Sequence, residues 1–351
     1  MRARMVRFTP GRLVGLLAAL SALSVAAFAL CVRYGEQPVS LLTAFSDPAS
    51  IDATILWSVR LPRAVLGAIV GAALATSGTT LQSLMRNPLA DPFVLGVSGG
   101  AALGATLAIA LGLGVVGDLG VVDPGSALTR LSAPSLFAFA GSAGAIALVF
   151  AVSRVQGQTS PYAALLTGVI FNAFASAAIT AVKTLLSHER LGTVLYWLAG
   201  TLGMERPWTL AGAAALQLVA VGLMWANAAS LNALTLGDED AASLGVEVAR
   251  ARRTLLLAAS LSVAGAVSLS GLVGFVGLIV PHVLRLWLGP DNRLLIPCSA
   301  VGGAAFLMLS DLVARLVFRF VSNELPVGVI TALLGGPFFL VLLRRQPHLR
   351  L

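Results

Sequence analysis

The chain has 351 residues, of which 58% are apolar and 11% are charged, and its formal net charge is +8. Soluble domains carry roughly 25% charged residues, so this chain has too little charge for a water-exposed surface, and we expect lipid around most of its exterior. Its hydrophobicity excludes a disordered chain, and its arginines stand in short gaps between apolar runs rather than in a basic patch with aromatics, which disfavours nucleic-acid binding.

Apolar runs of membrane-spanning length recur along the whole chain, and each is predicted to form a transmembrane helix. Uninterrupted runs exclude a β-barrel, whose strands would alternate apolar and polar residues. The predicted fold class is therefore all-α, a polytopic membrane protein with a single transmembrane domain over residues 1–351. The runs lie at about residues 13–32, 62–84, 93–116, 134–153, 161–186, 208–229, 253–271, 273–289, 296–318 and 326–343.

Four arginines precede the first run, which gives the N-terminus some likeness to a signal peptide. The run itself, at about 20 residues, is nearer the length of a spanning helix. We predict a retained first helix, with a cleaved signal as the alternative. Ten crossings put both termini on one side of the membrane, and the basic N-terminus indicates that this inner side is cytoplasmic. The segment from Arg33 to Leu61 is the longest on the opposite, outer side and has room for a surface helix.

A sharp inner turn is predicted between the second and third helices. Asn87 precedes Pro88 and Asp91 precedes Pro92, and proline disfavours helix at the residue before it. The glycines that follow permit close approach of two backbones, which serves either tight helix packing or a pathway lined by backbone. These glycines are Gly96, Gly99 and Gly100.

A second inner turn, residues 157–161, is predicted between the fourth and fifth helices. It contains Thr159 and Ser160.

The most polar part of the chain is the long inner segment at residues 230–253. Three consecutive acids, Asp238, Glu239 and Asp240, are predicted to begin a short helix there, because acidic side chains favour a helix N-terminus. The helix would then present a compact face. That face consists of Ala241, Ala242, Leu244 and Gly245.

The chain lacks the motifs that would let it drive transport alone. A P-loop needs a Gly-Lys-Ser/Thr run, and Lys183, the only lysine, follows a valine. Asp311 is the only acid well inside a predicted helix, and Arg315, one turn later, is placed to neutralise it. The histidines and cysteines share no metal-ligand spacing, so no cofactor or metal is expected. The energy should come from another subunit; an ion- or proton-coupled carrier that acts without an ATPase is the alternative.

Four segments together resemble one family, the FecCD/BtuC-type permeases of bacterial ABC importers. The likeness extends over about residues 58–345, and the second and third segments are the most specific. The four are Arg60-Leu-Pro-Arg63, the run Arg86-Asn-Pro-Leu-Ala-Asp-Pro to Ala101, Gly274-Phe-Val-Gly-Leu-Ile-Val-Pro-His-Val-Leu-Arg285, and Glu324-Leu-Pro-Val-Gly328 with Leu334-Gly-Gly-Pro337.

The resemblance implies a BtuC-like permease fold in the bacterial cytoplasmic (inner) membrane. It implies two ABC ATPase subunits, a periplasmic or lipid-anchored substrate-binding protein, and a second permease copy or a homologous permease. The cargo would be an iron–siderophore complex, with vitamin B12 or haem next. No nucleic acid is implied, and no residue performs covalent chemistry.

The resemblance also assigns roles to residues. In the family, the segment matching residues 230–253 is a coupling loop seated in a groove of the ATPase; a solvated acidic loop is the alternative. Arginines that match Arg60, Arg63 and Arg315 pair with glutamates of the binding protein; interfacial anchoring is the alternative. The turn at residues 157–161 matches the region that narrows the pore at its cytoplasmic end in the family, which makes Thr159 and Ser160 candidate gate residues; a plain turn is the alternative.

Overall fold

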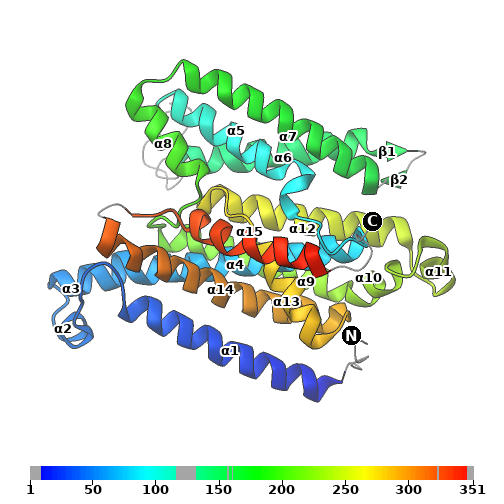
Figure 1. Ribbon diagram of the computed structural model, residues 1–351, viewed down its shortest axis with the longest axis horizontal. Helices are drawn as coiled ribbons and strands as arrows, with labels where there is room; N and C mark the ends of the chain where they lie inside the picture. The colour runs from blue at the N-terminus through cyan, green and yellow to red at the C-terminus, as the bar shows by residue number, and fades with distance from the viewer. Residues whose placement is uncertain (1–8, 116–131, 156–157, 160, 322–323, 346–351) are drawn as a thin grey trace.

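The computed structural model is a bundle of helices that run along one long axis (Figure 1), and it describes residues 9–115, 132–155, 158–159, 161–321 and 324–345. A two-stranded antiparallel hairpin, β1 (Arg154–Val155) and β2 (Gln158–Thr159), is the sheet of this described part. The helices are α1 (Pro10–Arg33), α2 (Leu41–Ser46), α3 (Ile51–Thr54), the π-helix η1 (Ile55–Arg60), α4 (Leu61–Leu84), the 3₁₀ helix η2 (Pro92–Leu95), α5 (Val97–Ala110), α6 (Ala133–Val152), α7 (Pro161–Thr184), α8 (His188–Leu198), α9 (Pro207–Ala226), α10 (Ala228–Leu234), α11 (Asp238–Ser243), α12 (Val248–Ser270), α13 (Val276–Leu288), α14 (Asn292–Val321) and α15 (Val327–Arg345).

The all-α prediction is confirmed, because each of the ten predicted runs coincides with one helix. Seven helices in the described part are long and apolar enough to cross a membrane, and α5, α13 and α15 are shorter apolar helices. The predicted lengths of the third and eighth runs are wrong. Helix α5 starts later because residues 92–95 form η2, and α13 starts later because Phe275 has a left-handed backbone (φ 68°) that interrupts the helix.

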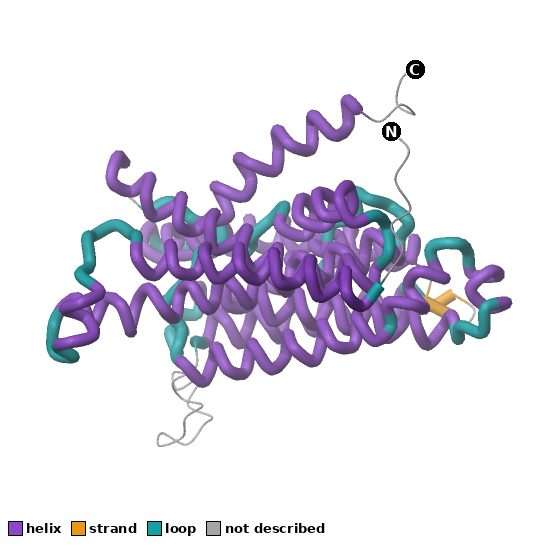
Figure 2. The backbone as a smooth tube through the Cα atoms, turned by 90° about the horizontal axis from the view of Figure 1, so that it is seen from below, coloured by secondary structure: helices purple, strands orange, loops and turns teal. Residues whose placement is uncertain are grey.

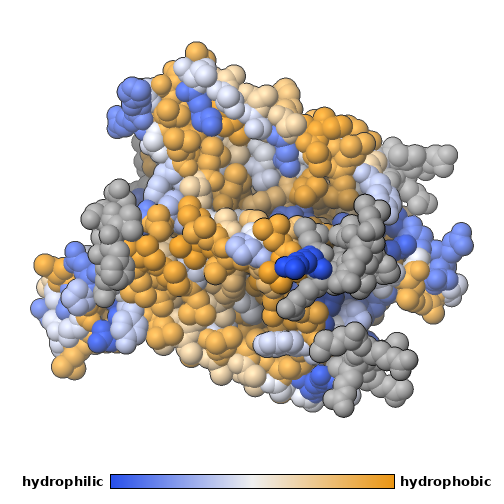
Figure 3. Space-filling model, viewed as in Figure 1, coloured by the Kyte–Doolittle hydropathy of each residue, from blue (hydrophilic) through white to orange (hydrophobic). Residues whose placement is uncertain are grey.

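Polar elements gather at the two ends of the bundle. Figure 1 shows α2, α3 and α8 at one end and α10, α11 and the hairpin at the other, which we call the α2 end and the α11 end. Helix α1 begins, and α15 finishes, toward the α11 end. Apolar side chains dominate the surface between the two ends in Figure 3, as expected for a surface in contact with lipid.

Local sequence explains where several helices begin. Ser40 and Ser50 cap α2 and α3 by accepting hydrogen bonds from the backbone N–H groups of Thr43 and Ala53. Proline occupies the first turn of α1 and of α9, where its missing N–H costs nothing. The predicted surface helix between Arg33 and Leu61 is present as α2 and α3.

Two prolines inside helices leave carbonyl groups that side chains from other helices satisfy. Pro281 cannot bond the carbonyl of Gly277, four residues earlier, and Gln82 Nε2 donates to that oxygen at 3.2 Å. Pro297 likewise frees the carbonyl of Arg293, which accepts a hydrogen bond from Trp225 Nε1 at 3.1 Å. Because hydrocarbon offers no hydrogen bonds, the buried carbonyl of Gly277 needs such a replacement partner.

Helix α4 lies in the centre of the bundle and is buried along most of its length. It packs against α9, α12, α13 and α14. A Cβ added at Gly71 would collide with the carbonyl of Gly303 on α14, and one at Gly78 would collide with the carbonyl of Gly277 on α13. Glycine therefore sets the distance between these backbones, as is common in membrane helix packing.

The crossing of α4 and α14 yields a first prediction. The variant Gly71→Ala should lower the free energy of unfolding by about 1–3 kcal/mol, because overpacking forces the two backbones apart. Thermal unfolding in detergent measures the change. Gly144→Ala is the matched control, because its added methyl group meets no atom within 4 Å. Equal stability of the two variants would contradict the close approach.

Candidate functional site

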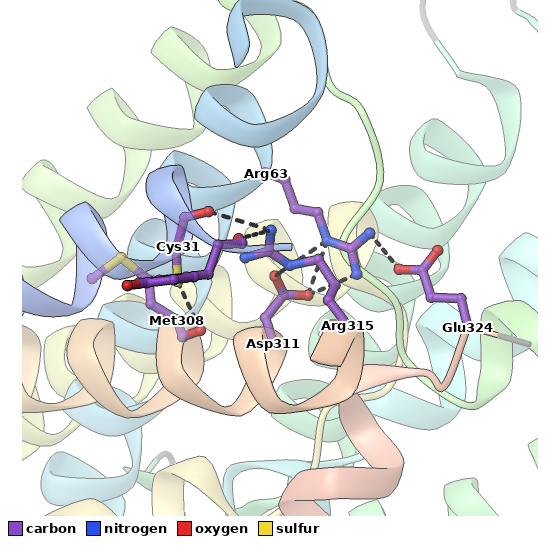
Figure 4. Close-up of polar contacts among 7 residues, drawn as sticks. Cys31, Arg63, Met308, Asp311, Arg315 and Glu324 are labelled. Carbon is purple, nitrogen blue, oxygen red and sulfur yellow. Dashed lines mark hydrogen bonds and ion pairs between the residues drawn. The ribbon is translucent and has the colours of Figure 1, made fainter. Parts of the chain in front are cut away.

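Asp311 lies at the centre of a cluster of charged side chains at the α2 end (Figure 4). Asp311 is 1% exposed. Arg63 donates to Asp311 Oδ1 from Nε at 2.9 Å and from Nη2 at 2.8 Å. Arg315 Nε lies 2.9 Å from Asp311 Oδ2, so the predicted neutralisation of Asp311 by Arg315 one turn away is confirmed. Two guanidinium groups thus compensate one buried carboxylate.

Arginines of this cluster also cap the end of α1. Arg60 Nη1 donates to the carbonyls of Val32 and Arg33 at 3.0 and 2.9 Å. Arg315 Nη1 donates to the carbonyls of Cys31 and Tyr34, both at 3.3 Å. The last carbonyls of a helix have no partner within the helix and carry partial negative charge. These two side chains therefore hold the end of α1 against α4 and α14.

Glu324, in the connection from α14 to α15, forms a second ion pair with Arg63. Beside this pair is a cavity of about 410 Å³, whose lining includes Arg60, Arg63, Arg315, Glu36 and Glu324. Burial, and next the charge of Glu324, raise the pKa of the Glu36 carboxyl above its usual range. The α2 end therefore contains a partly open pocket lined by both arginines and glutamates.

The structure brings together the three arginines that were predicted to dock a binding protein. It places Arg60, Arg63 and Arg315 at 3%, 9% and 4% exposure, with their donors directed at groups of the same chain. Their docking role stays a prediction, and they also have a structural role that the sequence analysis did not identify. The cavity beside them is lined by all three arginines.

The predicted short helix in the polar inner segment is confirmed as α11, which begins at Asp238. The helix is terminated by Gly245, which has a left-handed backbone (φ 82°). The N–H of Val246 donates to the carbonyl of Ala241 at 3.0 Å, which completes a Schellman motif. Ala241 is buried and Leu244 is 65% exposed. Among the other residues predicted for this segment, the exposed ones are Glu239, Asp240, Ala242 and Gly245.

Helix α11 is fixed to the bundle by an ionic contact that the sequence analysis missed. Asp238 accepts hydrogen bonds from Arg86 Nη2 at 3.1 Å and from Arg252 Nη2 at 2.7 Å. The hydrogen bond from Arg252 holds the pKa of the Asp238 carboxyl below its usual range. Arg86 lies 152 residues away in sequence, so no local pattern could have indicated the pair.

The predicted turn between α4 and α5 is confirmed. Asp91 caps η2 by accepting a hydrogen bond from Phe93 N–H at 2.8 Å, and Asn87 accepts one from Leu89 N–H at 2.9 Å. Pro88 follows Asn87 in this turn, and Pro92 is the first residue of η2. Gly96 then adopts φ 82° at the start of α5.

Gly99 and Gly100 lie where α5 meets its neighbours. The N–H of Gly99 donates to Asn172 Oδ1 of α7 at 3.1 Å, and a Cβ at Gly100 would collide with the carbonyl of Gly141 on α6. In this structure both glycines serve close packing, and a role in lining a pathway stays a prediction.

The two candidate gate residues are not tested by the structure. Thr159 is in β2 and pairs with Arg154 of β1, while Ser160 lies outside the described residues. Cys31 and Cys298 are both free and buried.

Comparison with known proteins gives consistent matches over nearly the whole chain. The profile of the FecCD transport family matches residues 17–345. The cobalamin import system permease protein BtuC of Halobacterium salinarum is 45% identical over 290 residues, which are 83% of this chain and 73% of that protein. The hemin transport system permease protein HmuU of Yersinia pestis is 38% identical over 317 residues, 90% of this chain and 91% of that protein.

A solved structure described as a metal-chelate type ABC transporter in an inward-facing conformation is also similar. It superposes with a TM-score of 0.78 at 29% identity, covering 95% of this chain and 100% of that one. The match extends the likeness from the sequence to the arrangement of the helices.

The Asp311 cluster yields a second prediction. Asp311→Asn should lower the free energy of unfolding by about 3–5 kcal/mol, because it leaves two buried guanidinium groups without their shared counter-charge. Thermal unfolding of the purified protein in detergent measures the loss. Glu189→Gln, at an exposed position of α8, removes the same charge from the same end and should change little. A stable Asp311→Asn variant would show that the cluster does not hold the helices together.

Proposed function

Given that this chain belongs to the FecCD transport family, we propose that it carries a metal chelate across the bacterial cytoplasmic membrane. The chain is the permease subunit of an ABC importer. Binding and hydrolysis of ATP in two separate subunits would drive its helices between alternating conformations. The observation that carries the proposal is the short helix α11, which ion pairs hold at one end of an apolar bundle. The sequence of this chain contains no P-loop with which to bind ATP.

The ATPase subunits bind at the α11 end. Helix α11 presents Leu244, which is 65% exposed, next to the exposed Ala242 and Gly245. A small exposed apolar patch fits a groove on a partner better than it fits bulk solvent. Since α1 begins and α15 finishes toward this end (Figure 1), both chain termini would be cytoplasmic.

A substrate-binding protein docks at the α2 end. The pocket there offers Arg60, Arg63 and Arg315 to carboxylates of the partner. Arginine–carboxylate pairs at a docking surface fix orientation and accelerate encounter more than they add affinity. In this conformation Glu324 already occupies one side of Arg63, so an incoming carboxylate would compete with it.

A second permease copy, or a homologous permease, covers part of the apolar exterior. Helix α7 exposes Leu166, Ile170 and Phe174 at 63%, 61% and 64%. Helix α15 diverges from the bundle toward its C-terminal end (Figure 2) and exposes Leu333 and Leu340 at 66% and 68%. Lipid would cover the rest, and the pathway for the cargo would lie between the two copies.

The cargo proposed first is an iron–siderophore complex, with a corrinoid or haem as the other candidates. The two similar permeases are named for cobalamin and hemin, and the similar structure is described as a metal-chelate type. All three cargo classes are bulky chelates, which fits a pathway between two copies better than a narrow pore through one.

Uptake into proteoliposomes tests the function. We expect ferric siderophore, cobalamin or haem to accumulate only when the permease is combined with its ATPase, its binding protein and ATP. Permease alone with an ion or proton gradient is the control, and uptake under that condition would replace the proposal with an ion-coupled carrier. The buried ion pairs of Asp311 already argue against a free mid-membrane carboxylate.

Helix α11 provides a test of the ATPase contact. Leu244→Asp should reduce co-purification of the ATPase at least about tenfold, as expected when a charge enters the apolar centre of an interface. Leu42→Asp is the matched control, because Leu42 is 83% exposed at the α2 end. Full assembly by the Leu244→Asp variant would remove α11 from the ATPase interface.

A substitution that leaves the Asp311 ion pairs intact tests the docking proposal. Glu324→Gln leaves Asp311 paired with both arginines and removes the carboxylate that competes for Arg63. Association with the binding protein should become about two- to tenfold faster at low salt and lose this gain at high salt. Glu189→Gln again serves as the control. An unchanged rate would indicate that Arg63 does not meet the partner.

A further inference from the structure

Arg86 occupies a backbone position that arginine does not favour. It follows the last turn of α4 with φ 52°. Arg86 N–H bonds the carbonyl of Ser83, and Asn87 N–H bonds the carbonyl of Gln82, which together form a Schellman ending. The left-handed residue of this motif is most often glycine, because a Cβ is disfavoured there. A side chain at this position needs a compensating role.

The side chain of Arg86 connects α4 to two other elements. Its Nε donates to the carbonyl of Leu234, the last residue of α10, at 3.0 Å. Its Nη2 pairs with Asp238 Oδ1, in the first residue of α11, at 3.1 Å. The left-handed backbone thus directs one guanidinium group at the end of α10 and at the start of α11.

Arg252 completes the contact from α12. It is 7% exposed, and its Nη2 reaches both carboxylate oxygens of Asp238 at 2.7 and 2.8 Å. Asp238 is therefore joined to α4 through Arg86 and to α12 through Arg252, while it belongs to α11 itself. A hydrogen-bonded charge pair with one buried member is stronger and more directional than an exposed ion pair.

Helix α4 extends from this contact to the other end of the bundle. The first turn of α4, at the α2 end, carries Arg63, which pairs with Asp311. Arg60 is the residue directly before α4. Because α4 is buried against four neighbours, it would move as a rigid rod rather than bend. Asp238 is thus connected through one packed helix to the charged pocket at the α2 end.

We propose that Asp238 is the positioning residue that passes movement of α11 on to α4 and α12 through Arg86 and Arg252. The inference rests on the proposed function, since it assumes that an ATPase acts on α11. The inference separates two roles within α11. Leu244 makes the contact with the ATPase, whereas Asp238 transmits the movement and need not contribute to assembly.

The test uses the full permease with its ATPase in lipid nanodiscs, with the binding protein added as the probe. The readout is the factor by which the binding protein stimulates ATP hydrolysis, recorded with the amount of ATPase bound. Arg86→Gly removes the guanidinium group and places the favoured residue at the turn. Asp238→Asn removes the shared carboxylate. Glu239→Gln removes an equal charge from the same first turn of α11, at an exposed position.

We expect Arg86→Gly and Asp238→Asn to bind the ATPase as the unmodified chain does and to lose about tenfold in stimulation, within the usual range for coupling between distant sites. Glu239→Gln should keep full stimulation. The double variant with both Arg86→Gly and Asp238→Asn should show no less stimulation than Asp238→Asn alone, because the two side chains act through one contact.

Full stimulation in both single variants would overturn the inference. So would an equal loss in Glu239→Gln, or a loss of ATPase binding that parallels the loss of stimulation. An unmodified permease that binds no ATPase would instead contradict the proposed function, and this result is seen before any variant is compared.

Discussion

The close approach of α4 to its neighbours is the constraint on which the rest of the structure depends. Glycines at the crossings with α13 and α14 bring backbone against backbone, and most residues of α4 are buried as a result. In a bilayer, where apolar side chains gain little by leaving lipid, tight packing of small residues is a main source of helix association. Helices α9, α12, α13 and α14 pack directly on α4, and arginines hold both of its ends.

Polar groups inside the bundle follow from the same constraint. A helix packed in hydrocarbon must find partners for every charge and every freed carbonyl within the protein. Asp311 is therefore held by two arginines, and the carbonyl released by Pro281 is bonded by Gln82. Arginine suits these positions because its planar guanidinium group can serve a carboxylate and a backbone carbonyl at once.

Arginines connect both ends of α4 to the segments at which we propose that partners bind. At the α2 end, Arg60 and Arg63 connect α4 to α1 and α14. At the α11 end, Arg86 connects it to α10 and α11. A buried helix with a fixed partner at each end can relate events on the two sides of a membrane without a channel through its own centre. This arrangement gives a physical basis for a permease whose helices are moved by a separate subunit.

The sequence by itself determined the helices, the turn after α4, the short helix α11 and the Asp311–Arg315 pair, because each depends on neighbours within a few residues. It overestimated α5 and α13, because apolar composition continues through η2 and through the buried loop before Val276. Only the tertiary structure decided that Arg63 meets Asp311 and that Arg86 meets Asp238. These partners are 248 and 152 residues apart, and their contact is set by how helices pack, which neither periodicity nor residue spacing encodes.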